Sequence, residues 1–165
     1  MSSSPKGAVR VTTARSLHAE KVTALASREP LTVDLGTPVA AVIQRMRAAR
    51  GEPALILRDG RLAGIFTERD VLLKVLGHDV PPGAPVDDYM KRDPHAMTAE
   101  ATLGEAAHLM DRGRFRHVPI VDGEGRPLLT LRQQDILAYI AEAFPAEILN
   151  LPPRPHQRLA EPEGA

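Results

Sequence analysis

Two residues with the chemistry of a binding site, Thr67 and Asp70, stand three positions apart just after a short apolar run at residues 62–66. That run is too short for a helix and follows an Asp-Gly turn signal, which favours a buried strand. A helical pattern of apolar residues then continues to Gly77, a residue that favours a left-handed helix stop. Thr67 is therefore predicted at the N-cap of this helix and Asp70 at its third position.

Two interpretations of this pair follow from its position. In the first, Thr67 and Asp70 form a capping box, in which each side chain bonds the backbone amide of the other residue. In the second, the free amides at the helix N-terminus attract a phosphate group, and the Asp70 carboxylate accepts hydrogen bonds from a ribose diol. These two residues alone favour the capping box, because capping boxes are far commoner than nucleotide sites.

Composition restricts the classes of function that are expected. The 165 residues carry 21 basic and 21 acidic side chains, so no net positive field favours nucleic acid, and only Arg112, Arg114 and Arg116 form a local basic cluster. Without cysteine there is no disulfide framework, thiolate nucleophile or cysteine zinc site. No apolar run has the length of a membrane span, and no signal peptide is expected. These features predict a soluble cytoplasmic protein that does not bind membranes, with nucleic-acid contact at the arginine cluster as the weaker alternative.

The segment before Thr67 predicts the order strand, helix, strand. Residues 31–33 indicate a short strand, and Thr37 and Pro38 are predicted as the N-cap and first residue of a helix that Gly51 ends. Residues 54–57 predict a second, buried strand. With the strand at 62–66 and the helix after Thr67, the first half of the chain has the predicted order β-α-β-β-α.

The same order recurs in the second half, as a count of positions shows. An offset of 64 matches Val22, Val39, Val42, Ile43 and Met46 to Val86, Leu103, Ala106, Ala107 and Met110. After a hairpin turn that is one residue longer, an offset of 65 matches Asp70, Val71, Leu72 and Val75 to Asp135, Ile136, Leu137 and Ile140. So many matched positions, interpreted as core positions, indicate a tandem repeat.

The repeat divides the chain into five expected segments. Residues 1–21 are expected to be a loosely ordered lead-in, 22–80 the first repeat, 81–85 a linker, 86–144 the second repeat, and 145–165 a C-terminal extension with a mobile tail. The last helix is predicted at about residues 133–144. The apolar residues 148–151 are expected to pack back on the core.

The chain resembles a stand-alone pair of CBS domains, the tandem unit called a Bateman module. The motifs that carry the resemblance are GIFTERDVL at residues 64–72, GRFRHVPIVD at 113–122, and the spacing of Val86, Met90 and Pro94 before the second repeat. The segment FPAEILNLPP at 144–153 is also similar to the C-terminal extension of some small bacterial CBS pairs. The resemblance covers roughly residues 22–153.

This resemblance implies an α/β (α+β) fold in which tandem β-α-β-β-α repeats pack about a pseudo-twofold axis, with clefts between them. It also implies a regulatory, non-catalytic module that forms homodimers and binds an adenosine-containing ligand: AMP, ADP, ATP, S-adenosylmethionine or NADH. By the same resemblance Asp70 would bind the ribose hydroxyls, and Thr67 would face the sugar and phosphate. The backbone of two strands would hold the adenine, at Gly64, Ile65 and Phe66 and at Pro53, Ala54 and Leu55.

Arg116 and His117 stand at a strand entry that lines the cleft in relatives. They are candidates either for contact with a ligand phosphate or for bonds to structural carbonyls. The second repeat departs from the pattern, because Arg132 occupies the position that matches Thr67, beside Asp135. Arg132 would either approach a phosphate as a charged donor or fill the cleft with its bulk. One functional nucleotide site is expected, with the Arg132 and Asp135 site degenerate.

Nothing else in the sequence supports catalysis or metal binding. No histidine has a second histidine at ligand spacing, and no Walker loop, dinucleotide fingerprint or nucleophile elbow is present. We therefore expect an adenine-nucleotide sensor without enzymatic activity, metal or obligatory cofactor, which acts on a separate effector protein. The alternative is a constitutive interaction or scaffold module, in which Thr67 and Asp70 only cap a helix.

Overall fold

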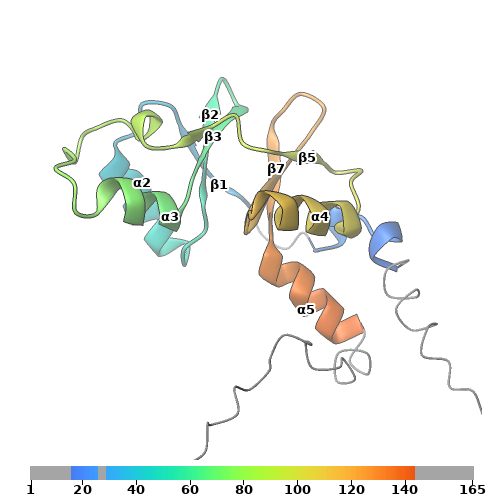
Figure 1. Cartoon of the computed structure of the whole chain (residues 1–165). Helices are drawn as coiled ribbons and strands as arrows, with labels where there is room; N and C mark the ends of the chain where they lie inside the picture. The colour runs from blue at the N-terminus through green and yellow to red at the C-terminus, as the bar shows by residue number, and fades with distance from the viewer. Residues whose placement is uncertain (1–15, 26–28, 144–165) are drawn as a thin grey trace, which may run out of the picture.

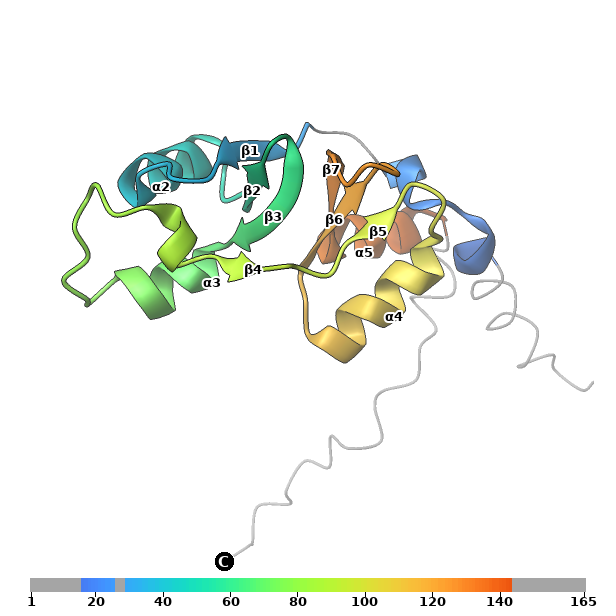
Figure 2. The same ribbon diagram turned by 90° about the horizontal axis from the view of Figure 1, so that it is seen from above.

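The computed structural model describes residues 16–25 and 29–143, which form two lobes lying side by side (Figures 1 and 2). The first lobe contains β1 (Leu31–Asp34), α2 (Val39–Ala48), β2 (Ala54–Arg58), β3 (Arg61–Phe66), α3 (Glu68–Asp70), the π-helical turn η2 (Val71–Val75), the 3-10 turn η3 (Val86–Asp88) and β4 (Lys91–Arg92). The second contains β5 (Met97–Thr98), α4 (Leu103–Gly113), β6 (His117–Val121), β7 (Pro127–Arg132) and α5 (Gln133–Ala143), together with the N-terminal 3-10 turn η1 (Val22–Leu25).

Both lobes follow the order β-α-β-β-α, which confirms the predicted fold class and its repeat. In the first sheet β1 runs parallel to β2, β2 and β3 form an antiparallel hairpin, and β4 adds an antiparallel edge. The second sheet repeats this with β5 parallel to β6 and β6 antiparallel to β7. Helices α2 and α4 supply the crossover that each parallel pair requires. The predicted helix at 133–144 is α5, whose described part ends at Ala143.

Each lobe has a hydrophobic core between its sheet and its helices. In the first lobe Val39, Val42 and Met46 of α2 pack with Ala54, Ile56 and Phe66 of the strands. In the second lobe Leu103, Ala106 and Met110 of α4 pack with Val118, Ile120 and Leu131. All of these side chains are at most 3% exposed. Burial of each valine, leucine, isoleucine, methionine or phenylalanine side chain stabilises the fold by about 1.5 to 3 kcal/mol.

The two lobes exchange the short segments that precede them in the sequence. Val22 is fully buried in the core of the second lobe, and its match Val86 is fully buried in the core of the first. The backbone bonds match too, because the Val22 amide donates to Ala101 O and the Val86 amide donates to Thr37 O, both at 2.9 Å. Figure 2 shows the blue N-terminal turn beside α4, away from the helices of the first lobe. Each core is therefore completed by a segment that enters from the opposite repeat.

The start of α2 differs from its prediction. The Thr37 hydroxyl donates to Asp34 O at 2.6 Å, and Pro38 is the N-cap residue without a side-chain bond. The prediction of Thr37 as the cap is therefore wrong. The first amides of the helix, at Val39 and Ala40, donate instead to Ala84 O and Pro82 O at 2.8 and 3.4 Å. Carbonyls of the segment expected to be a linker thus replace the side-chain cap.

The matched leucines of the two C-terminal helices also differ from prediction. Val71 and Val75 pack on the first core, but Leu72 is 62% exposed, and Leu137 in α5 is 60% exposed. Their assignment as core positions is wrong, because a helix buries one stripe and these leucines lie beside that stripe on its outer side. The segments 1–15 and 144–165, including the expected clamp at 148–151, lie outside the described residues.

Candidate functional site

Thr67 and Asp70 form the predicted reciprocal pair where β3 ends and α3 begins. The Thr67 amide and hydroxyl donate to Asp70 Oδ2 at 2.9 and 2.7 Å, and the Asp70 amide donates to Thr67 Oγ1 at 3.4 Å. This confirms the capping box. An ionised carboxylate has about four lone-pair positions, and Thr67 uses two of them. The cap is therefore compatible with further hydrogen bonds to Asp70.

Lys74 brings a cation to the same carboxylate. Its Nζ lies 2.8 Å from Asp70 Oδ1 and donates to Tyr89 O at 2.7 Å. The Asp70 side chain is 15% exposed, whereas that of Lys74 is 40% exposed. The sequence interpretation missed Lys74, although its position four residues after Asp70 is the spacing at which helical ion pairs meet. A carboxylate, a hydroxyl and an ammonium group thus lie together at one end of β3.

The strand residues predicted to hold adenine are buried. Ala54 pairs with Phe66 and Leu55 pairs with Ile65 across the β2–β3 hairpin, and all four are at most 6% exposed. Pro53, just before β2, is also fully buried. Their side chains are fixed by packing, so these residues can offer a ligand chiefly backbone atoms. Contact with adenine stays a prediction.

One face of the first sheet is turned toward the second lobe. Leu55 and Ile65 belong to neither core, and strand alternation places them on the face opposite the core. Lys91 of β4 pairs with Ile65 and so shares this face, and its Nζ lies 4.5 Å from the centre of the Phe115 ring in the second lobe. The Leu62 amide also donates to Gly125 O of the second lobe at 2.9 Å.

Gly64 has a packing role in β3. A Cβ built on it would lie 2.2 Å from Met90 Sδ, far inside van der Waals contact. Met90 is 7% exposed and belongs to the first core. Glycine at this position therefore allows the segment before β4 to lie close against the sheet.

Arg132 and Asp135, the matches of Thr67 and Asp70, form an ion pair with a third residue from the first lobe. Arg132 Nε and Nη2 donate to Asp135 Oδ2 and Oδ1 at 2.9 and 2.6 Å, and Nη1 donates to Glu52 Oε1 at 2.9 Å. The side chains of Arg132, Asp135 and Glu52 are 17%, 22% and 13% exposed. The hydrogen bonds to Asp135 are the main reason that the pKa of Arg132 is raised. Sequence reasoning missed Glu52, because it lies 80 positions from Arg132.

His117 lies with this second group. It stands opposite Arg132 in the β6–β7 pair. The charges of Glu52, Arg132, Glu68 and Asp135 act on the pKa of its imidazole. Burial lowers the pKa of His117, because desolvation disfavours the charged imidazolium. Arg116 is exposed, and its carbonyl accepts a hydrogen bond from the Gln133 amide at 2.9 Å. Their contact with a ligand stays a prediction.

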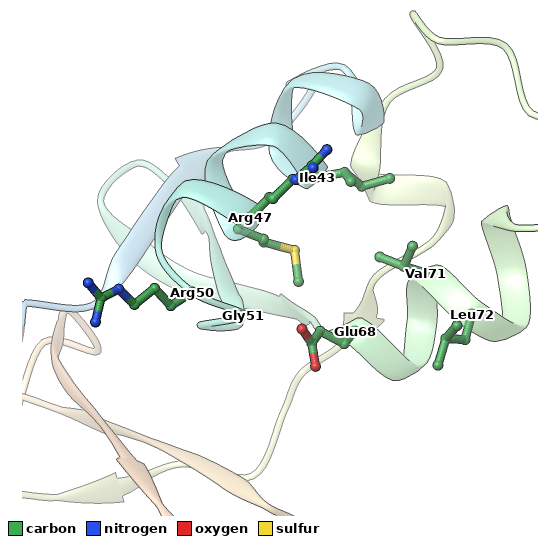
Figure 3. A pocket seen from close by; sticks show the side chains of 8 residues that line it. Ile43, Arg47, Arg50, Gly51, Glu68, Val71 and Leu72 are labelled. Carbon is green, nitrogen blue, oxygen red and sulfur yellow. The ribbon is translucent and has the colours of Figure 1, made fainter.

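A cavity of about 550 Å³ opens between α2 and the segment that follows Thr67 (Figure 3). Its lining consists of Ile43, Met46, Arg47, Arg50, Gly51, Glu68, Val71 and Leu72. Figure 3 shows Ile43 and Val71 on opposite sides of this cavity and Arg50 extending away from it. Neither Thr67 nor Asp70 lines it, although Glu68 lies between them in the sequence. This cavity is thus distinct from the predicted nucleotide site.

Within residues 16–25 and 29–143, no group of three or more histidine, cysteine, aspartate or glutamate side chains is placed to hold a metal ion. Among the helices of the same residues, none has both the length and the apolar character needed to cross a bilayer.

Comparison with known proteins identifies the family. The model of the CBS domain family matches twice in tandem, at residues 22–77 and 86–142. The chain therefore belongs to the CBS domain family and carries two CBS domains. A CBS domain-containing protein of Arabidopsis thaliana, CBSCBSPB1, is 32% identical over 88 residues, which cover 53% of this chain but 16% of that protein. The chain thus spans about a sixth of the length of this relative.

Solved structures share the fold. The CBS domain protein NE2398 superposes with a TM-score of 0.66 at 26% identity, over 73% of this chain and 97% of that one. CBSX2, solved in complex with AMP, has the same TM-score at 20% identity, over 74% of this chain and 97% of that one. At that lower identity the likeness establishes the fold alone.

Proposed function

We propose that this CBS pair is a regulatory adenine-nucleotide sensor whose ligand binds at Thr67 and Asp70. The observation that carries the proposal is the Thr67–Asp70 pair itself, which fixes a mostly buried carboxylate at the end of β3. A carboxylate is an acceptor suited to a ribose diol; of its about four lone-pair positions, Thr67 uses two and the Lys74 ammonium a third. The complex of CBSX2 with AMP gives a precedent among proteins of this fold.

The repeat suggests what faces this pair. Arg132 reaches Glu52 of the first lobe at 2.9 Å, and the matches of these two residues are Thr67 and Arg116. By the same pseudo-twofold relation, we infer that Arg116 lies across from Thr67. An exposed guanidinium there is suited to a phosphate group, which it would bind through two parallel hydrogen bonds. The ligand would then touch Asp70 in one lobe and Arg116 in the other.

Such a ligand would act by shifting a conformational equilibrium. If it binds better to one relative setting of the two lobes, it raises the population of that setting by its difference in affinity. No catalytic step is part of this proposal, and the output is a changed surface for a separate effector protein. The proposal places the protein in the cytoplasm, where adenine nucleotides are available.

The exposed leucines support a homodimer. Leu72, Leu73 and Leu76 are 62%, 61% and 58% exposed after α3, and Leu137 is 60% exposed in α5. Leu72 also lines the cavity. Leu72 and Leu137 are matched positions of the repeat, so both lobes expose a leucine at the same place. We propose that a second copy of the chain covers these side chains, because clustered exposed apolar residues mark interaction sites.

The alternative function is a constitutive interaction module that binds no nucleotide. The Thr67–Asp70 cap would exist in such a module too, so the cap by itself does not separate the two. A thermal-shift panel with AMP, ADP, ATP, S-adenosylmethionine and NADH separates them. A ligand at about 100 times its dissociation constant adds about 2.7 kcal/mol, or roughly 5 to 11 °C for a chain of this size. No shift with any of the five favours the interaction module.

A further inference from the structure

Three donor groups already surround the Asp70 carboxylate. Oδ2 accepts from the amide and the hydroxyl of Thr67 at 2.9 and 2.7 Å, and Oδ1 lies 2.8 Å from Lys74 Nζ. An ionised carboxylate has about four lone-pair positions, so about one remains open, on Oδ1. A ribose diol donates two hydrogen bonds. One of the present donors must therefore leave if both hydroxyls are to bind.

Lys74 is the donor that can leave most readily. The Thr67 amide is fixed in the backbone, and the Thr67 hydroxyl belongs to the capping box. Lys74 instead carries its ammonium on a flexible aliphatic stem, and its side chain is 40% exposed, against 15% for Asp70. An ion pair with a partly exposed partner contributes little to stability, because water and salt screen it. A ligand hydroxyl can therefore replace the ammonium with a small loss of stability.

The Lys74 ammonium is held at the site by a second acceptor. Its Nζ donates to Tyr89 O at 2.7 Å. Tyr89 directly follows η3 and packs against the first core, so its carbonyl is held by a packed segment. The ammonium thus bridges the η2 turn that carries Lys74 and the segment that carries Tyr89. The site therefore holds a cation of its own where one ribose hydroxyl would bind.

We propose that Lys74 is a competitor built into the nucleotide site: its ammonium occupies the position of one ribose hydroxyl on Asp70 Oδ1, and a full ribose releases it. This inference rests on the proposed function and deepens it, because it makes Lys74 a specificity-determining residue of the same site. A deoxyribose, which lacks one hydroxyl of the diol, fits beside Lys74. A ribose gains a second hydrogen bond only where Lys74 loses one, so wild type should distinguish poorly between AMP and deoxy-AMP.

Calorimetric titrations of AMP and deoxy-AMP into wild type and Lys74→Met test the competitor. The ratio of the two dissociation constants is the measured quantity, because the lost charge acts equally on the phosphate of both ligands. In Lys74→Met the preference for AMP should rise about tenfold or more, the factor that a hydrogen bond to a charged group contributes. Lys21→Met, which removes a surface pair with Glu100 in the second lobe, is the control and should leave the ratio within about twofold. A ratio in Lys74→Met that stays within about twofold of wild type overturns the proposal.

Release of Lys74 is tested in wild type, so that the result does not depend on the folding of the variant. The acetylation rate of Lys74 by an N-hydroxysuccinimide ester is followed by mass spectrometry without nucleotide, with saturating AMP and with saturating deoxy-AMP. AMP should raise the rate about two- to fivefold, the range that loss of a partly exposed ion pair allows. Deoxy-AMP should leave it unchanged, and Lys21 is the reference in the same molecule. Slower acetylation with AMP would show that Lys74 binds the ligand phosphate, and this result or an unchanged rate would overturn the release.

The outcomes separate this inference from the proposed function. AMP binding that Asp70→Asn abolishes, with an unchanged ratio in Lys74→Met, overturns the competitor and leaves the sensor in place. Wild type that does not bind AMP, together with Lys74→Met that binds it through Asp70, supports the competitor and refutes the sensor. Two folded proteins that both fail to bind AMP refute both proposals. Where circular dichroism shows that Lys74→Met is unfolded, the acetylation rates in wild type decide.

Discussion

The Asp70 carboxylate accepts hydrogen bonds from both the amide and the hydroxyl of Thr67, at 2.9 and 2.7 Å. A second capping box, Thr102 with Glu105, begins α4, with the Thr102 amide donating to Glu105 Oε2 at 2.8 Å. That hydrogen bond is the main reason that the pKa of Glu105 is lowered. The two boxes share a local geometry, but only the Thr67–Asp70 box lies in the GIFTERDVL segment at residues 64–72. A substitution of Glu105 is therefore a control for the corresponding substitution of Asp70.

Substitution of Gly64 by alanine should destabilise the first lobe. The new Cβ would lie 2.2 Å from Met90 Sδ, so β3 or the segment carrying Met90 must shift, at about 1 to 3 kcal/mol. Gly83→Ala is the control, because a Cβ at that residue meets no atom within 4 Å. Urea denaturation measures both variants. Equal midpoints for the two would contradict the packing role of Gly64.

The exchanged segments should contribute equally to their cores. Val22→Ala and Val86→Ala each remove two methyl groups from a fully buried position, for a loss of about 2 kcal/mol in the free energy of unfolding. Lys21→Ala removes a surface pair with Glu100 and should cost less than about 1 kcal/mol. The idea that residues before β1 complete the second core fails if Val22→Ala is as mild as Lys21→Ala in denaturant titrations.

His117 should make stability depend on pH. Because burial lowers its pKa in the folded state, the unfolded chain binds the proton more tightly, with an ordinary pKa of about 6.5. The His117 contribution is therefore fully present above about pH 6.5 and declines as the pH falls toward the lowered folded value. The slope is at most about 1.4 kcal/mol per pH unit, for one proton.

Denaturation of wild type and His117→Gln at a series of pH values measures this contribution. As the pH falls from about 7.5 to 5.5, the free energy of unfolding should decline less in the variant than in wild type. Parallel stability curves for the two proteins over that range would contradict a lowered pKa of His117 in the folded state.

The proposed dimer should depend on the exposed leucines after α3. Leu72→Glu places a charge among apolar side chains and should weaken self-association at least about tenfold, as measured by analytical ultracentrifugation. Leu128→Glu is the matched control, since Leu128 is 45% exposed on β7 and lies outside those helices. A dimer that tolerates Leu72→Glu, or one that only Leu128→Glu dissociates, would show that another surface is used.

Local signals were sufficient for much of the fold. Both hairpins and the Thr67–Asp70 cap depend on residues within a few positions of one another, so turn chemistry and hydrophobic periodicity predicted them. The repeat was predicted because the same pattern recurs at a nearly constant offset along the chain. The exchange of Val22 and Val86 was not predictable, because periodicity identifies an apolar position but not the core it joins. The misassigned leucines Leu72 and Leu137 have the same origin, since a helical stripe has edges that only its packing partners define.

Some residues of the candidate site were predictable from local spacing, and others were not. Thr67 and Asp70 followed from their spacing, and Lys74 could have followed from its spacing to Asp70. The partner of Arg132 is Glu52, in the other lobe, and no local pattern connects the two. The buried hydroxyl of Thr130 likewise depends on which strand face is covered. Such features require the three-dimensional packing of both lobes.

The most direct test of the sensor proposal is a calorimetric titration of AMP into wild type, Asp70→Asn and Glu105→Gln. Both substitutions remove the charge from a capping box and should lower stability by about 0.5 to 2 kcal/mol at most. We predict saturable binding to wild type and Glu105→Gln and its loss in Asp70→Asn, because only Asp70 would bind the ribose. Equal AMP affinity in Asp70→Asn and Glu105→Gln would contradict the proposed site.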